Sequence, residues 1–95
     1  MISEAELLAK VPSQLYINGL WLDGSTGKTI EVKDPSTGKV IKTIADASPE
    51  DGILALDAAV AVQEEWAATP PRVRGEMLRK AFELVQERKD EFALL

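Results

Sequence analysis

The sequence predicts an α+β fold for this 95-residue chain, in which antiparallel β-hairpins are followed by two long helices. Two observations lead to this prediction. Residues 15–45 contain short apolar runs separated by turn-forming pairs such as Asn-Gly and Asp-Pro, which are typical of hairpins. Residues 49–67 and 70–95 instead repeat their apolar residues at helical spacing, and Pro stands at the start of each stretch.

A short helix is expected first, over residues 3–10. Ser3 and Glu6 have the spacing of a capping box, in which the hydroxyl accepts a hydrogen bond from an early backbone N–H and the carboxylate accepts one from the N–H of the serine. Two adjacent leucines give this helix a small apolar face, and Pro12 prevents its continuation.

Residues 15–45 are expected to form two antiparallel hairpin-like units. In the first, Asn18 and Gly19 lie between two apolar runs, and a type I′ turn there requires positive φ at both residues. In the second, residues 29–33 and 40–45 are the strands. The Asp-Pro-Ser-Thr-Gly sequence between them is the turn, because Pro presets φ and Gly accepts a left-handed conformation.

Residues 49–67 are expected to form a helix with a well-marked start. Ser48 is the predicted N-cap, and Pro49 occupies the first helical position. Glu50 and Asp51 lie at the positive end of the helix dipole. Apolar residues cover about half of the circumference; they are Ile53, Ala55, Leu56, Ala59, Val60, Val62 and Trp66.

Residues 70–95 are expected to form a second long helix, with Thr69 as its N-cap and two prolines in its first turn. Arg74 and Arg88 fall within its apolar arc. Their aliphatic stems are interpreted as lying along the core with the charged ends in water. The alternative is a buried or interfacial ion pair with a carboxylate inside or outside the chain. The apolar residues are Met77, Leu78, Ala81, Phe82, Leu84, Val85 and Phe92.

Both helices need apolar cover that two small hairpins can supply only in part. The helical pattern also runs to Leu95 without the Gly, Asn or Pro that usually ends a helix. We therefore expect residues 1–95 to be a single truncated segment of a larger domain, open at its C-terminal end. If the segment folds in isolation, we expect dimers or higher assemblies in which a second copy covers the helix faces.

The composition excludes much catalytic chemistry. The chain has no Cys and no His. It therefore has no disulfide, no thiolate nucleophile, no Ser–His pair and no imidazole metal ligand. The net charge of −5 argues against nucleic acid as a partner. The acidic excess lies in residues 46–71, which contain six acids and no base, and we interpret it as a solvated helix face.

No targeting signal or membrane span is predicted. The first residues are acidic, whereas a signal peptide begins with basic residues. The longest apolar run, Ala58–Val62, is far too short to cross a bilayer. A cytoplasmic location without a membrane partner is therefore expected.

Gly27, Lys28 and Thr29 suggest a phosphate-binding loop, but the pattern fails. A P-loop needs Gly at the position that Leu22 occupies, and it needs a helix after the Lys, where a strand is expected. No G-x-G-x-x-G fingerprint is present either. The carboxylates of residues 49–67 are explained by a solvated face. We expect no catalytic, cofactor-binding or metal-ligating residue in this chain.

Several motifs occur in a characteristic order. They are Leu15-Tyr-Ile-Asn-Gly-Leu-Trp-Leu-Asp-Gly24, Asp34-Pro-Ser-Thr-Gly-Lys-Val-Ile41, Glu65-Trp-Ala-Ala-Thr-Pro-Pro71, Arg72-Val-Arg-Gly-Glu-Met-Leu-Arg-Lys-Ala81 and Glu87-Arg-Lys-Asp-Glu-Phe-Ala93. Each is weak alone, but the series from Leu15 to Leu95 closely resembles the N-terminal portion of the NAD(P)-dependent aldehyde dehydrogenase superfamily. The amino-acid sequence of Trp66–Lys80 and Phe82–Leu95 is most similar to that of bacterial succinate-semialdehyde dehydrogenases.

The resemblance implies a parent oxidoreductase of α/β architecture with a Rossmann-type cofactor domain and NAD or NADP as cofactor. In that family a Cys thiolate attacks the aldehyde, hydride passes to the cofactor, and water activated by a Glu hydrolyses the thioester. The residues that carry these steps lie downstream of the matching stretch, so no functional residue is transferred to this chain. Residues 1–95 are then a scaffold segment that binds no cofactor and is inactive alone. Its expected partners are the remainder of the parent enzyme or a second copy, in a homo-oligomer.

Two other functions stay open at this point. The chain could be a short, non-catalytic interaction module that self-associates or pairs with full-length subunits through its helix faces. It could also be a small nucleotide-binding protein, although only Gly27-Lys28-Thr29 favours this and unchanged melting with ATP and Mg²⁺ would exclude it.

Overall fold

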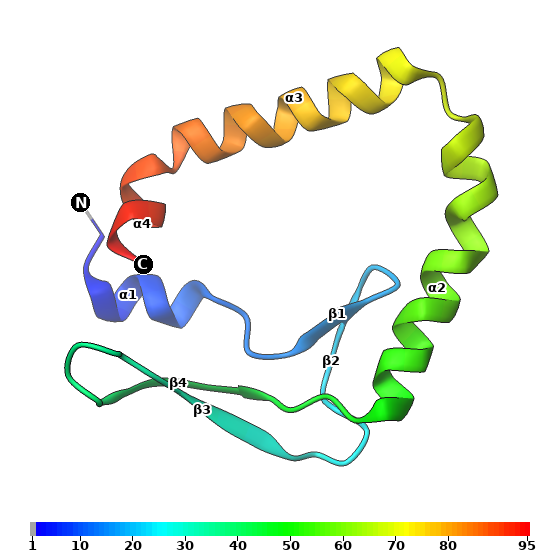
Figure 1. The fold of residues 1–95 in the computed structure, drawn as a ribbon. Helices are drawn as coiled ribbons and strands as arrows, with labels where there is room; N and C mark the ends of the chain where they lie inside the picture. The colour runs from blue at the N-terminus through cyan, green and yellow to red at the C-terminus, as the bar shows by residue number, and fades with distance from the viewer. Residues whose placement is uncertain (1) are drawn as a thin grey trace. The chain divides into compact units, whose positions relative to one another are not determined.

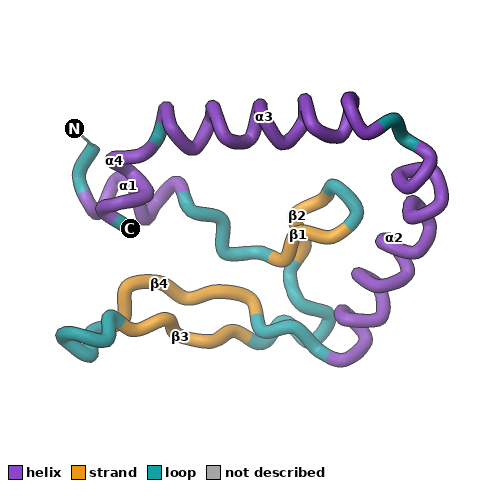
Figure 2. Tube along the Cα trace, turned by 45° about the horizontal axis from the view of Figure 1, so that its top comes forward, coloured by secondary structure: helices purple, strands orange, loops and turns teal. Residues whose placement is uncertain are grey.

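The computed structural model describes residues 2–95 and has the predicted fold class, with antiparallel hairpins followed by helices (Figures 1 and 2). The elements are α1 (Glu4–Lys10), β1 (Leu15–Ile17), β2 (Leu20–Leu22), β3 (Thr29–Lys33), β4 (Val40–Ala45), α2 (Pro49–Ala68), α3 (Pro71–Glu87) and α4 (Lys89–Leu94). They form two compact units. Unit 1 takes in the N-terminal residues up to Lys10 and Gln63–Leu95, and unit 2 is Val11–Val62.

The first hairpin of unit 2 confirms the predicted Asn-Gly turn. β1 and β2 pair antiparallel, with Tyr16 opposite Trp21. Asn18 has φ 52° and Gly19 has φ 76°, so both central residues are in the left-handed region that a type I′ turn requires. The rings of Tyr16 and Trp21 lie 4.8 Å apart between centroids, which stabilises the pair across the strands.

The second hairpin joins β3 and β4, also antiparallel and with the predicted strand bounds. The register shifts between Val32 and Lys33, where the pairing is irregular. In the turn, the carboxylate of Asp34 accepts hydrogen bonds from the Ser36 N–H at 2.8 Å and the Ser36 hydroxyl at 2.7 Å. Gly38 has φ 74°, as the turn chemistry predicts.

The predicted start of α2 is correct. The Ser48 hydroxyl accepts a hydrogen bond from the Asp51 N–H at 3.2 Å, and the Asp51 carboxylate accepts one from the Ser48 N–H at 2.9 Å. These two bonds make a complete capping box with Asp at its third helical position. α2 extends one residue beyond the predicted end, to Ala68.

The predicted start of the next helix is wrong. Thr69 is not the N-cap of α3, because its hydroxyl donates to the Glu65 carbonyl at 3.0 Å, within the last turn of α2. Pro70 is the N-cap instead, and no side chain makes a capping hydrogen bond there. With one hydroxyl proton, Thr69 closes the preceding helix rather than opening the following one.

The single helix predicted for residues 70–95 is divided into α3 and α4. Arg88 lies between them with φ −105° and ψ 20°, outside the helical region. Its N–H still donates to the carbonyls of Leu84 and Val85, at 3.1 and 3.2 Å. The backbone hydrogen bonds of α3 thus continue up to the break at Arg88. The spacing of apolar residues in the sequence does not reveal this break.

The short N-terminal helix α1 confirms its predicted capping box. The Ser3 N–H donates to the Glu6 carboxylate and the Glu6 N–H donates to the Ser3 hydroxyl, both at 3.2 Å. Leu7 of this helix is buried, with 6% of its surface exposed.

Few side chains are buried. Among residues 2–95, Leu7 and Ile17 are the buried large hydrophobic residues, and the large apolar side chains of α2, α3 and α4 are mostly exposed. In the part of the chain that the structure describes, no helix is long and apolar enough to cross a membrane.

Candidate functional site

The loop with the Gly-Lys-Thr sequence is a hairpin connection, as the failed P-loop pattern predicts. Gly27 has φ 71°, and its N–H donates to the Gly24 carbonyl at 2.9 Å. Lys28 leads directly into β3 rather than into a helix. No helix N-terminus therefore faces this loop from the position where a P-loop places one.

Asp51 is the most densely bonded polar group of unit 2. Its carboxylate accepts hydrogen bonds from the Ser25 N–H at 3.2 and 3.0 Å, one to each oxygen, and from the Ser48 N–H at 2.9 Å. The hydroxyls of Ser48 and Ser25 lie 3.1 and 3.3 Å from Oδ2. The cluster of Ser25, Ser48 and Asp51 joins the β2–β3 loop to the first turn of α2.

The interpretation of the acidic segment as a solvated face holds for Glu50, Asp57, Glu64 and Glu65, which are exposed, but it is wrong for Asp51. Asp51 is only 6% exposed, and the backbone N–H groups of Ser48 and Ser25 lower its pKa by stabilising the charged form. The sequence carried a usable signal. Ser48-Pro-Glu-Asp51 has the same S-x-x-acid spacing as Ser3 to Glu6, which is the spacing of a capping box.

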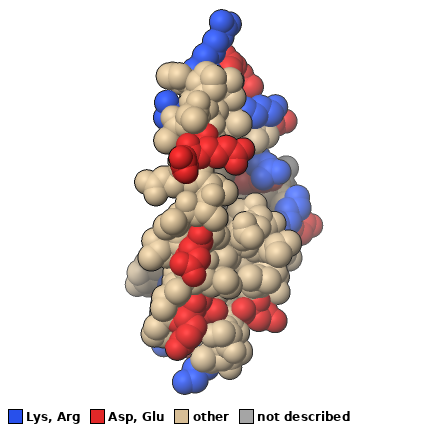
Figure 3. Space-filling view, turned by 90° about the vertical axis from the view of Figure 1, so that its right-hand side faces the viewer, with Lys and Arg blue, Asp and Glu red and all other residues tan. Residues whose placement is uncertain are grey.

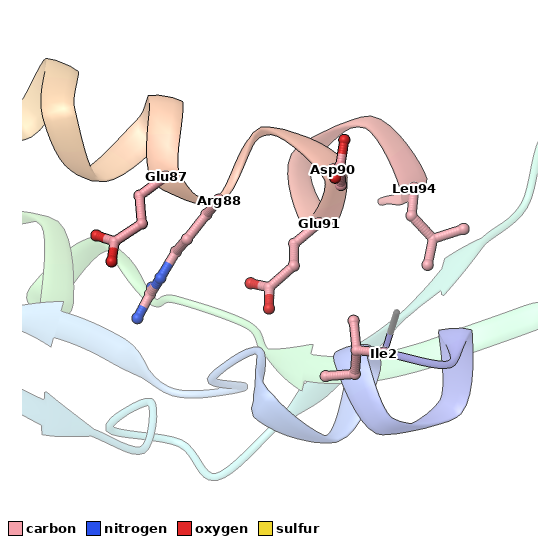
Figure 4. A pocket seen from close by; sticks show the side chains of 6 residues that line it. All are labelled: Ile2, Glu87, Arg88, Asp90, Glu91 and Leu94. Carbon is pink, nitrogen blue, oxygen red and sulfur yellow. The ribbon is translucent and has the colours of Figure 1, made fainter.

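The two arginines of the apolar arc have different surroundings. The Arg74 Nε donates to the Thr69 carbonyl at 3.1 Å, so one N–H of its guanidinium binds backbone just after the end of α2. Arg88 is exposed, as the snorkelling interpretation requires. It extends to the same side as Glu87 and Glu91 in a hollow of about 350 Å³ that Ile2 and Leu94 also line (Figure 4).

The carboxylates form no metal centre among residues 2–95, where no group of three or more Asp or Glu side chains is placed to hold an ion. The described residues also lack the dinucleotide-binding fingerprint. Their glycine-rich segments lead into strands, whereas pyrophosphate binding needs a G-x-G-x-x-G turn that opens a helix. The expectation that this chain holds no site residue stays a prediction.

The helices expose the side chains that were expected to need cover. The exposed fractions of Leu56, Leu78 and Phe82 are 62%, 72% and 57%. In the view that faces α2, acidic groups interrupt a mainly uncharged surface (Figure 3). The exposed large apolar residues of the helices are Ile53, Leu54, Leu56, Val60, Val62, Trp66, Val73, Met77, Leu78, Phe82, Leu84, Val85, Phe92 and Leu94, and we call them the apolar helix faces.

A hollow lies beside the part of the apolar helix faces that belongs to the start of α2. In unit 2, the first hairpin and the N-terminal half of α2 enclose a hollow of about 370 Å³. We call it the hairpin–α2 hollow. Its apolar wall residues are Ile17, Leu20 and Leu22 from the hairpin and Leu54 and Ala58 from the helix, with Asn18 and Asp57 beside them. An open apolar hollow beside exposed apolar helix surface is suited to packing against further polypeptide.

Residues 21–95 match the sequence profile of the aldehyde dehydrogenase family. This chain belongs to the aldehyde dehydrogenase family. The chain is 42% identical over 81 residues to an α-ketoglutarate semialdehyde dehydrogenase from Haloferax volcanii, a match that covers 84% of this chain and 17% of that protein.

Solved structures of this family superpose on the chain. A double mutant of betaine aldehyde dehydrogenase from Staphylococcus aureus in complex with NAD+ has a TM-score of 0.88 at 28% identity, covering 96% of this chain and 19% of that one. An aldehyde dehydrogenase from Brucella melitensis has a TM-score of 0.83 at 37% identity, covering 88% and 17%. The hairpins and helices are therefore the fold of this part of the family.

The chain spans less than a fifth of the length of these relatives, 17% to 19% in the matches described. The match from Trp21 onward includes the apolar helix faces and most of the hairpin–α2 hollow. The surfaces that are open here thus belong to a region that, in the relatives, is a small part of a longer polypeptide.

Proposed function

We propose that this chain acts as the N-terminal scaffold segment of an NAD(P)-dependent aldehyde dehydrogenase, an enzyme that oxidises an aldehyde to a carboxylate. The exposed apolar helix faces are the observation that carries the proposal. Fourteen large apolar side chains of α2, α3 and α4 are exposed. A helix that faces only water carries mostly polar residues, so these side chains are suited to packing against other polypeptide. The occupant we propose for these faces is the rest of the enzyme, including its Rossmann-type cofactor domain.

The segment is proposed to supply packing surface rather than reacting groups. The sequence contains no Cys, so this chain cannot provide a thiolate to attack an aldehyde. The cofactor, NAD or NADP, is proposed to bind the parent enzyme outside these residues; the Staphylococcus aureus relative is in complex with NAD+. The hairpins and helices would then stabilise the domain that carries the chemistry.

The proposed substrate of the parent enzyme is succinate semialdehyde, which would be oxidised to succinate. The similarity of residues from Trp66 onward to succinate-semialdehyde dehydrogenases supports this choice. The Haloferax volcanii relative carries the name of a different semialdehyde, α-ketoglutarate semialdehyde. Both compounds carry a carboxylate at the end of the chain opposite the aldehyde, so the proposal in its broader form is an aldehyde with a distal carboxylate.

A chimeric enzyme tests the scaffold role. Residues 15–95 would replace the matching segment of the Brucella melitensis aldehyde dehydrogenase, and NADH or NADPH formation would be followed by absorbance. We expect the chimera to retain activity and the same enzyme without its segment to lose it. A matched chimera carrying Leu78→Asp and Phe82→Asp should be inactive. Full activity of that variant would contradict the proposal, because two buried charges cannot be tolerated in a packed face.

The isolated chain tests inactivity and substrate together. We expect no NADH or NADPH formation from succinate semialdehyde by the 95-residue chain alone. Turnover by this chain would exclude a purely structural role. Sequencing the source gene beyond codon 95 then decides where the chemistry lies, since an open frame leading to a Rossmann segment and a Cys would supply the proposed parent enzyme.

The same exposed faces favour a second function, a non-catalytic interaction module that self-associates. The discriminating measurement is the mass of the isolated chain by size-exclusion chromatography with light scattering. Dimers that dissociate on Leu78→Asp substitution would show that a second copy covers the apolar helix faces, which the module requires and an isolated scaffold segment also allows. A monomer would exclude the self-associating module.

A further inference from the structure

Asp51 connects two parts of unit 2 that are distant in the sequence. The Ser25 N–H, 26 residues away, donates to both carboxylate oxygens, and the Ser48 N–H donates to Oδ2. Asp51 is 6% exposed, so this carboxylate is withdrawn from water and held by protein donors. A capping box alone would need only the contacts with Ser48.

The serine hydroxyls complete one consistent proton arrangement. The two Oγ atoms lie 2.6 Å apart, and each hydroxyl has one proton to donate. If the Ser25 hydroxyl donates to Ser48 Oγ and the Ser48 hydroxyl donates to Asp51 Oδ2 at 3.1 Å, each hydroxyl proton has one acceptor and the carboxylate stays ionised. The arrangement works only while the carboxylate accepts. A protonated carboxyl would bring an additional donor into a site already filled with donors.

Gly24 shows how closely the loop approaches the start of α2. A Cβ on Gly24 would lie 2.7 Å from the Asp46 carbonyl oxygen and 3.6 Å from Asp51 Oδ2. Gly24 is also buried. The β2–β3 loop therefore lies directly against the segment that precedes α2, and the hydrogen bonds of Asp51 join two segments that are already in close contact.

These contacts lie where the two walls of the hairpin–α2 hollow are joined. The hairpin wall ends at Leu22, and the chain then enters the loop that contains Ser25. The helix wall contains Leu54 and Ala58, one and two turns after Asp51 on α2. Fixing Ser25 to Asp51 thus fixes the hairpin wall relative to the helix wall.

We propose that Asp51 is an acid-sensitive latch, whose ionised carboxylate holds the β2–β3 loop against α2 and thereby keeps the two walls of the hairpin–α2 hollow in place. Protonation releases the Ser25 N–H and loosens the hairpin wall. The latch goes beyond the scaffold role and does not depend on it, because all of its parts lie in unit 2 of this chain.

Donors, not counter-charges, stabilise the ionised form. The backbone N–H of Ser48 and then that of Ser25 contribute most to the lowered pKa of Asp51. The charged residues on the segments packed against the cluster are Asp23 and Lys28 in the loop, Asp46 before α2, and Glu50 and Asp57 on α2.

The pH window follows from the direction of the shift. A folded-state pKa below the unfolded value of about 3.9 means that the latch is complete above that pH and is lost as the pH falls through the folded pKa. Asp34 also has a lowered pKa, because of its hydrogen bonds to Ser36 in the β3–β4 turn. Acid will therefore weaken both the Asp51 contacts and the β3–β4 turn, and a variant is needed to separate the two contributions to stability.

The test compares the whole chain with two single variants by urea unfolding between about pH 6 and about pH 3. Asp51→Asn removes the charge of the latch, and Glu50→Gln removes an equal charge from the adjacent residue in the same helical turn. We expect the urea midpoint of the Asn variant to fall less than half as much on acidification as that of the unmodified chain. The Gln variant should follow the unmodified chain. Equal falls for the Asn variant and the unmodified chain would overturn the proposal.

Nuclear magnetic resonance of the unmodified chain keeps the test decisive if Asp51→Asn does not fold. The amide of Ser25 and the methyl groups of Leu22 and Leu54 would be followed during acid titration. One shared midpoint below about pH 3.9 is expected, because the latch and the hollow change together. If the Ser48 amide titrates and the Ser25 amide and the methyl groups do not, Asp51 is only a helix cap and the latch is excluded.

Discussion

The starts of α2 and α3 are held in different ways. α2 begins with a complete capping box, and its Asp51 also accepts the Ser25 N–H from another segment. α3 begins at Pro70 without a side-chain capping bond, and both α3 and the following α4 expose large apolar residues. Polar contacts thus anchor the start of α2, whereas the start of α3 has no side-chain capping bond and its large apolar residues are exposed.

Gly24→Ala should have the largest effect on the anchored region. The new Cβ would lie 2.7 Å from the Asp46 carbonyl oxygen, and backbone must move to relieve the clash. We expect a loss of about 1–3 kcal/mol in the free energy of unfolding, as for other overpacked sites. Urea unfolding followed by circular dichroism measures it.

Gly52→Ala is the matched control for that prediction. Nothing lies within 4 Å of the position where its Cβ would be placed, and Gly52 is in the first turns of α2. Alanine is favoured over glycine in helices, so stability should rise by about 0.5–1 kcal/mol. Equal effects of the two substitutions would mean that the loop does not approach α2 as described.

Ser48→Ala should have the next largest effect, about 1 kcal/mol, because it removes the N-cap hydroxyl and the partner of Ser25. Thr69→Ala is the comparison at the other helix, where no capping bond to α3 is lost. Thermal unfolding of both variants sharpens the contrast. A larger loss at Thr69 than at Ser48 would reverse the assignment of which helix is anchored by its cap.

Phe82→Ala measures how open the α3 face is. Full burial would make the substitution cost about 3–5 kcal/mol. Phe82 is 57% exposed, and we therefore expect less than about 1 kcal/mol for the isolated chain. A cost in the upper range, measured on a chain shown to be monomeric, would contradict the exposed face. The same substitution in the proposed parent enzyme should show the larger value.

Asp34→Asn should have the smallest effect, and the effect should shrink in acid. The Ser36 hydroxyl and N–H lower the pKa of Asp34, so its contribution is present above about pH 3.9 and is lost as the pH falls. The variant should therefore lose stability at neutral pH and differ less from the unmodified chain in acid. An unchanged difference across this range of pH, by urea unfolding, would show that ionisation of Asp34 does not stabilise the turn.

Local chemistry made much of the fold predictable. The Asn-Gly turn, the bounds of β3 and β4, and the caps at Ser3 and Ser48 depend on residues that are close in the sequence. The collinear motifs likewise led to the correct family. Each of these features follows from local backbone preferences or from short, ordered patterns.

The sequence by itself therefore determined the order and type of the elements and the family. Only the tertiary structure decided the features that depend on distant or competing partners. Asp51 has one partner three residues away and another 26 residues away, and no periodicity specifies the second. Thr69 and Arg88 could each have continued or opened a helix, and the choice depended on which backbone groups their donors reached. Hydrogen bonds between segments are decided by the geometry in which those segments meet, and that geometry exists only in the folded chain.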